Sequence, residues 1–294
     1  MAVRSSKVLS GLSKWPMEHY TVYVTHDGET SGLKAPMLSY YADPFAWTHG
    51  GQFWVFAEEF RYLHDRGRIV AIPGKTGATA QVALDLPYHL SFPFLFEESG
   101  ELFMLPESRR NHTLSLFVCE DFPGRWRHVH DIFAGVDAVD SVIFRHDGLW
   151  WIITSLLHPR QSERSLAIFF CEDFRQRVWT PHPVNGENRY SDRTQGSGRN
   201  GGSVFRHEHN LFRVMQSSRS HYGQSIEIMQ IARLTPQIYD EKPASQDDLP
   251  LPLRRKGDAH HLSVCGAHVA WDVRDRVSYR QHLALPKRRL PSRG

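Results

Sequence analysis

The sequence lacks the features that mark several common protein classes. It has three cysteines in 294 residues, so no disulfide framework is expected. No apolar run approaches the ~20 residues that a membrane helix needs, and residues 1–15 hold no apolar stretch long enough for a signal peptide. We therefore predict a protein without a membrane span, in a reducing, cytoplasmic compartment.

Motifs for nucleotides and metals are also missing. There is no Gly-rich phosphate loop, no Cys-x-x-Cys pair and no His-Glu-x-x-His motif, and the GSGRNGG stretch at 196–202 has the wrong spacing for a nucleotide fingerprint. The net charge is only +3, and much of the basic excess lies in the tail 286–294, which favours a solvated tail over a phosphate-binding one. Nucleic acid is not an expected partner, and no cofactor or metal is predicted.

What the sequence does contain is a repeat. The tetrapeptide Cys-Glu-Asp-Phe occurs at 119–122 and at 171–174, and a tryptophan follows each copy. Each copy is preceded by a hairpin-like segment, in which an apolar run, a polar turn and an aromatic-rich run follow one another. Segments of this kind occupy 43–59, 92–108, 140–155, 201–217 and, more weakly, 258–273. A period of about 50 residues is typical of propellers and solenoids.

The repeated unit predicts strands. Runs of Phe, Trp, Val and Ile are bounded by Gly, Asp, Asn or Pro, and about four such runs fit into each unit. We therefore predict an all-β fold, a five-bladed β-propeller with four-stranded blades around a central channel. The alternative, a pair of β-sandwiches, does not explain repeats in register. The predicted organisation is an N-terminal arm over 1–14, the propeller over 15–285 and a basic tail over 286–294.

The register of the repeat separates candidate chemistry from scaffold. The position eight residues before the turn glycine holds Asp43, Asp140 and Asp258 in three of the five units. In a propeller this position lies at one mouth of the channel, so the three carboxylates are expected to converge, and like charges held close push their pKa values apart. The alternative is that each aspartate only caps a turn.

A second register, seven residues after the turn glycine, holds Glu58 and Glu107. Glutamates at the ends of such apolar strands are unusual, because Glu is rarely buried unless it is paired or used. Glu107 is the better candidate for a general acid, since the apolar LFMLP run before it favours a raised pKa. The alternative is that both glutamates form salt bridges with Arg109 or Arg199.

Histidines before the inner strands are candidate ligands of a substrate. His89, His260 and His261 precede or begin such strands, where they could contact a substrate or hold a cation through water. The alternative is a hydrogen-bonded structural histidine. Arg199 is a further candidate, because its guanidinium group suits a carboxylate or phosphate.

The segments YYADPFAW, HLSFPFLFEESGELFMLPES, CEDFPGRW, DSVIFRHDGLWWIIT and YGQSIEIMQIARLTPQIYDE resemble one propeller family. It is the domain N-terminal to the glycosyltransferase part of plant glucosamine inositolphosphorylceramide transferases, found also in bacterial proteins of surface-polysaccharide pathways. The resemblance covers about residues 15–285. More distantly, the architecture is similar to the five-bladed glycosidases of family 43.

The glycosidase resemblance implies roles for particular residues. Those enzymes place an Asp general base, often before Pro, in blade one, a second Asp in blade three and a Glu acid in blade four. Asp43-Pro44 and Asp140 match the first two, but blade four begins Gly201-Gly202-Ser203 without a glutamate. Glu107 would then supply the acid from blade two. Calcium is possible by the same analogy, although the sequence shows no ligand set.

Two functions follow. In the first, the chain is a glycosidase-like hydrolase of a surface or capsular polysaccharide or a glycoconjugate. In it Asp43 activates water or acts as nucleophile, Glu107 protonates the leaving oxygen and Asp140 holds the substrate. Glu58, His89, Arg109, Arg199, Asp258, His260 and His261 are the expected substrate-binding residues. In the second, the channel binds a glycan without chemistry and assists a glycosyltransferase or another polysaccharide-biosynthesis partner.

Overall fold

The computed structural model describes residues 16–74, 77–157, 164–186, 198–217, 225–250, 253 and 259–278. Within these residues the chain is almost entirely β-strand, which confirms the predicted all-β class. Its helices there are four short 3-10 turns: η1 (Arg109–Asn111), η2 (Phe174–Gln176), η3 (Pro183–Gly186) and η5 (Gln246–Asp248). None of the described helices is long and apolar enough to span a bilayer. The predicted arm, the predicted tail and Asp258 lie outside the described residues.

Three sheets of four strands follow the first three repeats, each strand pairing with the next along the chain. The first sheet holds β3 (Ser39–His49), β4 (Gln52–Arg61), β5 (Arg66–Pro73) and β6 (Gln81–Leu84). The second holds β7 (Ser91–Glu98), β8 (Glu101–Ser108), β9 (Thr113–Asp121) and β10 (Arg125–Ala134). The third holds β11 (Ala138–His146), β12 (Leu149–Leu157), β13 (Arg164–Cys171) and β14 (Thr180–Pro181).

The remaining described strands form one eight-stranded sheet in the order β18-β17-β16-β15-β19-β20-β1-β2. One half holds β15 (Arg199–His207), β16 (Asn210–Ser217), β17 (Ser225–Leu234) and β18 (Tyr239–Pro243). The other holds β19 (His261–Cys265), β20 (His268–Ser278), β1 (Pro16–His26) and β2 (Glu29–Leu33). The halves meet at a parallel pairing of Gly202 with Leu262, whereas neighbouring strands within each half pair antiparallel. The N-terminal strands therefore complete the last repeat, which the sequence analysis did not anticipate.

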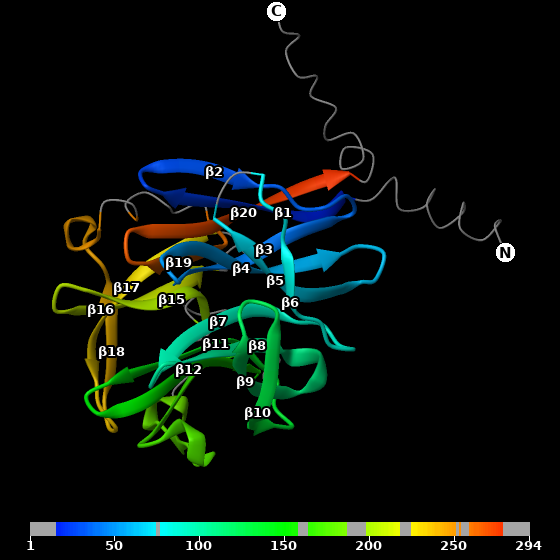
Figure 1. Ribbon diagram of the computed structural model, residues 1–294. Helices are drawn as coiled ribbons and strands as arrows, with labels where there is room; N and C mark the ends of the chain where they lie inside the picture. The colour runs from blue at the N-terminus through cyan, green and yellow to red at the C-terminus, as the bar shows by residue number, and fades with distance from the viewer. Residues whose placement is uncertain are drawn as a thin grey trace, which may run out of the picture.

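The first strands of the five repeats lie in the middle of the molecule (Figure 1). β3 contacts β7, β7 contacts β11, β11 contacts β15, β15 contacts β19, and β19 contacts β3 again. This closed cycle brings residues that are far apart in the sequence to one central space.

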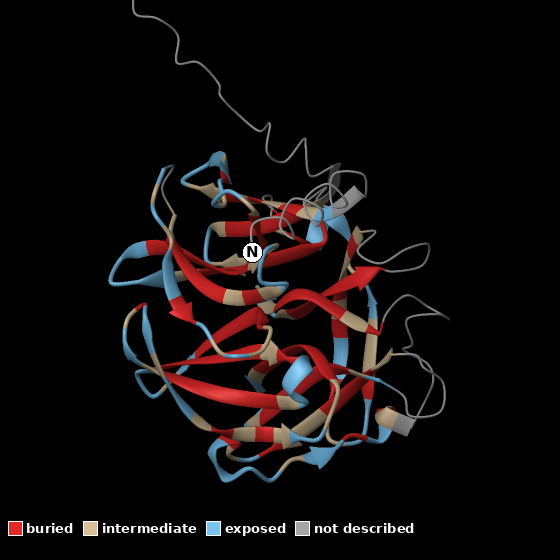
Figure 2. Cartoon of the chain, turned by 90° about the vertical axis from the view of Figure 1, so that its right-hand side faces the viewer, coloured by how far each residue is buried: buried red, intermediate tan, exposed pale blue. Residues whose placement is uncertain are grey.

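The second strands of the first four repeats are buried along most of their length, and buried segments fill the inside of the molecule in Figure 2. β4 and β12, for example, each carry a continuous run of buried residues. Such runs are expected where a sheet is covered on both faces, because neither face then needs polar side chains. Exposed residues gather in the turns and outer strands (Figure 2).

The Cys-Glu-Asp-Phe repeat packs one sheet against the previous one. Phe122 contacts Trp54 and Phe56 of β4, with ring centroids 5.1 and 5.9 Å apart. Phe174 contacts Phe103 of β8 in the same way, at 5.3 Å. The repeat is thus part of the scaffold.

A β-bulge marks the start of the first three inner strands. The register breaks after Ala42, Ser91 and Val139. The next residues, Asp43, Phe92 and Asp140, have φ angles of 50°, 44° and 52°. Aspartate tolerates this left-handed conformation better than most residues, and a bulge redirects the side chain that it carries. Asp43, Phe92 and Asp140, which each lie eight residues before a turn glycine, are therefore equivalent in three dimensions.

Candidate active site

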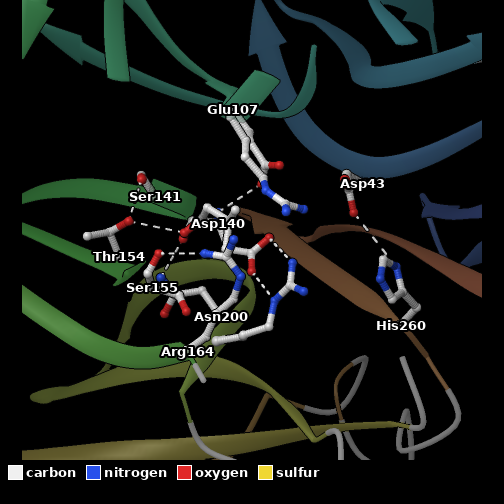
Figure 3. A network of polar contacts seen from close by, with 12 residues as sticks. Asp43, Glu107, Asp140, Ser141, Thr154, Ser155, Arg164, Asn200 and His260 are labelled. Atoms are coloured by element: carbon white, nitrogen blue, oxygen red, sulfur yellow. Dashed lines mark hydrogen bonds and ion pairs between the residues drawn. The ribbon is translucent and has the colours of Figure 1, made fainter. Parts of the chain in front are cut away.

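A cavity of about 360 Å³ lies over the central strands and receives side chains from several sheets. It is lined by eight of the ten residues that the sequence analysis selected: Asp43, Glu58, His89, Glu107, Arg109, Asp140, Arg199 and His260. In Figure 3, Asp43, Glu107, Asp140 and His260 point from different strands toward one space. The structure therefore brings together both acidic registers of the repeat.

Asp43 is held at the β3 bulge by the last sheet. Its backbone N–H donates to Asp272 Oδ2 at 2.9 Å, and its Oδ1 lies 3.7 Å from His260 Nδ1. Burial is the main cause that raises the pKa of Asp43 to about 7; the charges of Asp272 and Asp140 add to it, while His260 and Arg199 oppose it. A carboxyl with this pKa can exchange protons near neutral pH.

Asp272, which the sequence analysis missed, orients this part of the site. It is fully buried, and its oxygens accept from the His261 N–H at 2.8 Å and lie 3.2 Å from His260 Nδ1. Burial alone would lower the pKa of His260, but the charge and hydrogen bond of Asp272 outweigh it and raise that pKa. The available signal was an aspartate inside the apolar run VAWDV.

Glu107 and Asp140 form the opposite side of the cavity. The Asp140 backbone N–H donates to Glu107 Oε2 at 3.2 Å, and Arg199 binds the Asp140 carboxylate through two contacts, of 2.6 and 3.1 Å. Burial, followed by the charge of Asp140, raises the pKa of Glu107 to about 8, although Arg199 acts against this. The two carboxyls therefore differ in role: Asp140 is an ion-paired carboxylate, and Glu107 holds its proton at neutral pH.

Glu58 lies on β4 opposite Ala42, the residue before the β3 bulge. Its side chain is 7% exposed, and Oε1 lies 3.5 Å from His89 Nε2. Burial, and then the charges of Asp43 and Glu107, raise the pKa of Glu58 well above its usual value. His89 accepts the Gly67 N–H at Nδ1, and burial followed by the charges of Arg110 and Arg109 lowers its pKa to about 4. His89 is therefore a neutral imidazole at physiological pH.

The expected salt bridges of the two glutamates go to aspartates instead. Arg199 binds Asp140, and Arg109 lies at the rim with its Nε 3.1 Å from Asp137. The two arginines reach the cavity, but neither forms an ion pair with Glu58 or Glu107 among the described contacts.

Two of the selected residues are not at the cavity surface of the described structure. His261 is 1% exposed and packs edge-on against Phe45 and Phe92, at 4.7 and 5.2 Å. Burial lowers its pKa to about 3, so it is a neutral packing side chain between aromatic rings. Asp258 lies outside the described residues.

A series of buried hydrogen bonds holds the backbone of Asp140 and Arg199 in place. Asn200 donates to the Asp140 carbonyl oxygen at 2.6 Å and accepts from Arg213 Nη1 at 3.2 Å. Arg213 is fully buried and binds Glu241 through two contacts, of 2.6 and 2.9 Å. Sequence reasoning did not find these hydrogen bonds, because Arg213 and Glu241 lie on different strands without a shared motif.

Gly202, at the start of the inner strand of the fourth repeat, leaves no room for a side chain. Gly202 has a φ of 145°, and a Cβ atom on it would overlap the backbone carbonyl of Leu262. Because the two halves of the eight-stranded sheet meet at this residue pair, a glutamate cannot occupy Gly202.

The described residues contain two groups of three side chains whose ligand atoms lie within 4.8 Å of one another. Asp43, His260 and Asp272 form one, but Asp272 is already taken by internal hydrogen bonds. This set does not match the six to eight oxygen ligands, roughly, that Ca²⁺ prefers. The other group, His26 with Asp27 and His268, lies away from the cavity. We assign no metal to either group.

The closed cycle of inner strands and the acidic cavity above it define a β-propeller-like protein with the fold of glycoside hydrolases. A thermostable family-43 glycoside hydrolase superposes with a TM-score of 0.52 and 12% identity over 80% of this chain and 89% of its own. Zg3597, a family 117 glycoside hydrolase from the marine bacterium Zobellia galactanivorans, superposes with a TM-score of 0.51 and 11% identity over 79% and 76%.

The family is given by sequence. Residues 10–257 match the family described as glucosamine inositolphosphorylceramide transferase 1, N-terminal, and the chain belongs to it. Glucosamine inositolphosphorylceramide transferase 1 of Arabidopsis thaliana is 31% identical over 77% of this chain, and that of Oryza sativa subsp. japonica is 32% identical over 70%. The chain spans only 29% and 28% of the length of these relatives.

Proposed function

We propose that the chain is a glycan-processing protein that hydrolyses an O-glycosidic bond in the central cavity. The observation that carries this proposal is a set of carboxyls in different states facing one space. Asp43 and Glu107 have pKa values raised to about 7 and about 8, whereas Asp140 forms an ion pair with Arg199. Pairs of carboxyls whose environments separate their roles are what glycosidases use.

In this mechanism Asp43 takes a proton from a water molecule as the water oxygen attacks the anomeric carbon. Glu107 gives its proton to the glycosidic oxygen as the carbon–oxygen bond breaks, so that an alcohol and a reducing sugar leave. Asp140 and Arg199 hold the sugar, and Asp272 with His260 keeps Asp43 in place. Solvent then returns a proton to Glu107 and removes one from Asp43.

We also propose that the fold is a five-bladed propeller, in which the eight-stranded sheet counts as two blades. The cycle of five inner strands supports this, and so does the change from antiparallel to parallel pairing between β15 and β19. The N-terminal strands β1 and β2 then close the ring by completing the blade that β19 and β20 begin.

A second candidate function is a non-catalytic glycan-binding module that assists a glycosyltransferase or polysaccharide-biosynthesis partner. It is favoured by the match to the N-terminal region of much longer transferases and by the absence of a glutamate from Gly201-Gly202-Ser203 at the start of the fourth repeat. The cavity would then recognise a glycan without breaking a bond.

Turnover of a broad panel of defined glycans and glycoconjugates distinguishes the two functions. Asp43→Asn and Glu107→Gln are each expected to lower the rate by on the order of 10²–10⁴-fold, because each removes a proton-transfer group. Glu59→Gln is the matched control, since Glu59 is a buried glutamate that pairs with Arg68 at 2.7 Å outside the cavity lining. Unchanged turnover in either active-site variant would remove that residue from the mechanism. Binding of a panel member by the wild type without turnover would favour the module.

A further inference from the structure

Glu58 is a buried carboxyl that the mechanism above does not use. Its side chain lines the cavity, yet Oε1 is inaccessible and has no hydrogen-bond partner among the described residues. An ionised carboxylate in that state would be costly, because a buried charge needs a partner or hydrogen bonds. Glu107, by contrast, accepts the Asp140 N–H.

The pocket around Oε1 is shaped by Gly67 of β5. A Cβ atom on Gly67 would overlap both Glu58 Oε1 and the Leu90 carbonyl oxygen, so the absence of a side chain there makes room for the carboxyl. The Gly67 N–H also donates to His89 Nδ1 at 2.9 Å. One glycine therefore accommodates the carboxyl and orients the imidazole beside it.

The orientation of His89 determines which hydrogen faces Glu58. Because Nδ1 accepts from Gly67, the ring hydrogen of the neutral imidazole is on Nε2. Nε2 lies 3.5 Å from Glu58 Oε1 without forming a hydrogen bond to it, so the nearest ring of a histidine is a neutral imidazole and not an imidazolium that could stabilise a carboxylate. Oε1 is thereby suited to be the carbonyl oxygen of a protonated carboxyl, which leaves Oε2 as the hydroxyl on the cavity side.

The other groups around Glu58 also disfavour a negative charge there. Acidic groups on three other strands raise the pKa of Glu58 through their charges: Asp43 of β3, Glu107 of β8 and Asp272 of β20. Tyr40 of β3 is a neutral neighbour, and the opposing charge is Arg110, whose guanidinium group is at the exposed surface and 3.6 Å from Asp65. The effect of these acidic groups on Glu58 thus outweighs that of Arg110, whose charge is also shared with Asp65.

We propose that Glu58 is kept as a neutral carboxylic acid that donates a hydrogen bond from Oε2 to an oxygen of the bound sugar. The ligand class is a glycan that presents an uncharged acceptor to this wall, such as a hydroxyl, a ring oxygen or an acyl carbonyl. His89 and Gly67 are positioning residues that act through Glu58. The identity of the ligand as a glycan rests on the proposed function, whereas the protonation state of Glu58 does not.

Infrared difference spectroscopy of the whole chain at pH 7 tests the protonation state without any ligand. Wild type minus Glu58→Gln is expected to contain the carbonyl band of a protonated carboxyl. Glu59→Gln, which removes a carboxylate paired with Arg68, should give a carboxylate band instead. A carboxylate band in the Glu58→Gln difference would overturn the proposal.

His89 is tested by the frequency of the same band, which reports the polarity of the surroundings of Oε1 and not folding alone. His89→Phe is expected to shift the band, and His89→Gln, which retains an N–H donor, to restore it in part. An unshifted band in His89→Phe would show that His89 does not position Glu58.

Binding to an immobilised panel of defined oligosaccharides tests the role toward sugars. Glu58→Ala is expected to weaken binding of a recognised member by about tenfold, the value of roughly one or two hydrogen bonds. Glu58→Gln keeps a donor, so its affinity should stay within about threefold of the wild type and decline less at alkaline pH. Full affinity in Glu58→Ala would overturn the sugar contact. If the wild type bound no panel member, the proposed function would fail, while the infrared result would still stand.

Discussion

At the scale of single residues, the site depends on which acidic groups have cationic partners. Asp140 is bound by Arg199 at 2.6 Å and Asp272 by His260 at 3.2 Å. Glu58 and Glu107 occupy equivalent ends of β4 and β8 and have no such partner in the described structure. Aspartates that are paired and glutamates that are protonated allow several acids to share one small cavity.

The pH dependence of turnover belongs to this scale. Asp43 must be ionised to accept a proton, so the rate is expected to rise through its pKa of about 7. Glu107 must be protonated to donate, so the rate should fall as the pH passes its pKa of about 8. A profile of kcat/KM against pH should therefore be a narrow bell between these limbs. Glu107→Gln should remove the alkaline limb from any residual activity, and a limb that persisted there would assign it to another group.

At the scale of strands, bulges in β3 and β11 place two of the acids, and Gly202 pairs β15 with β19. Asp43 and Asp140 reach the cavity because β3 and β11 break register at the same point. The fourth repeat has one more residue at its break, and there Gly202 lies against Leu262. A register break near the start of the inner strand thus positions an acid in two sheets, and in the fourth repeat it brings Gly202 against Leu262.

Gly202→Ala tests the pairing of β15 with β19. The new methyl group would overlap the Leu262 carbonyl, and an L-residue at a φ of 145° is itself strained, by about 1–3 kcal/mol. We expect urea unfolding to show at least that loss of stability. Gly266→Ala is the control, because Gly266 also has a positive φ but nothing within 4 Å of its Cβ position. Equal losses in both variants would mean that the contact with Leu262 adds nothing.

At the scale of the whole molecule, the N-terminal strand links the closure of the fold to the site. β1 pairs with β20 along its length, and Val22 stands opposite Asp272. Tyr20 of the same strand lines the cavity and packs on the His260 ring at 4.7 Å. Residues about 250 positions apart in the chain therefore build one wall of the cavity.

Val22→Asp tests the contribution of this closure to stability. Val22 is fully buried in the core of the first and last repeats, so an unpaired carboxylate there should cost about 3–5 kcal/mol. The expected result is a much lower urea midpoint together with weaker near-ultraviolet dichroism. Glu29→Ser, at an exposed position of β2, should leave both unchanged. A normal midpoint in Val22→Asp would show that the fold does not depend on β1.

Much of the site was predictable because the repeat is in register. Asp43, Asp140, Glu58 and Glu107 were found by counting from turn glycines, and the bulges and paired strand ends give those counts a physical meaning. Asp272 and Tyr20 were not found, since nothing local distinguishes an acid or a tyrosine in an apolar strand from a packing residue. His261 looked like a channel residue, but it fills a gap between Phe45 and Phe92.

The sequence by itself determined the all-β class, the repeated unit and the positions at which acids enter the centre, because strand periodicity and turn chemistry are local properties. Only the tertiary structure decided the state of each acid. Whether a carboxyl is paired, as Asp140 is with Arg199, or buried without a cation, as Glu58 is, depends on which strands close the ring. Electrostatic energy depends on distance and burial, and both are set by contacts between residues that are far apart along the chain.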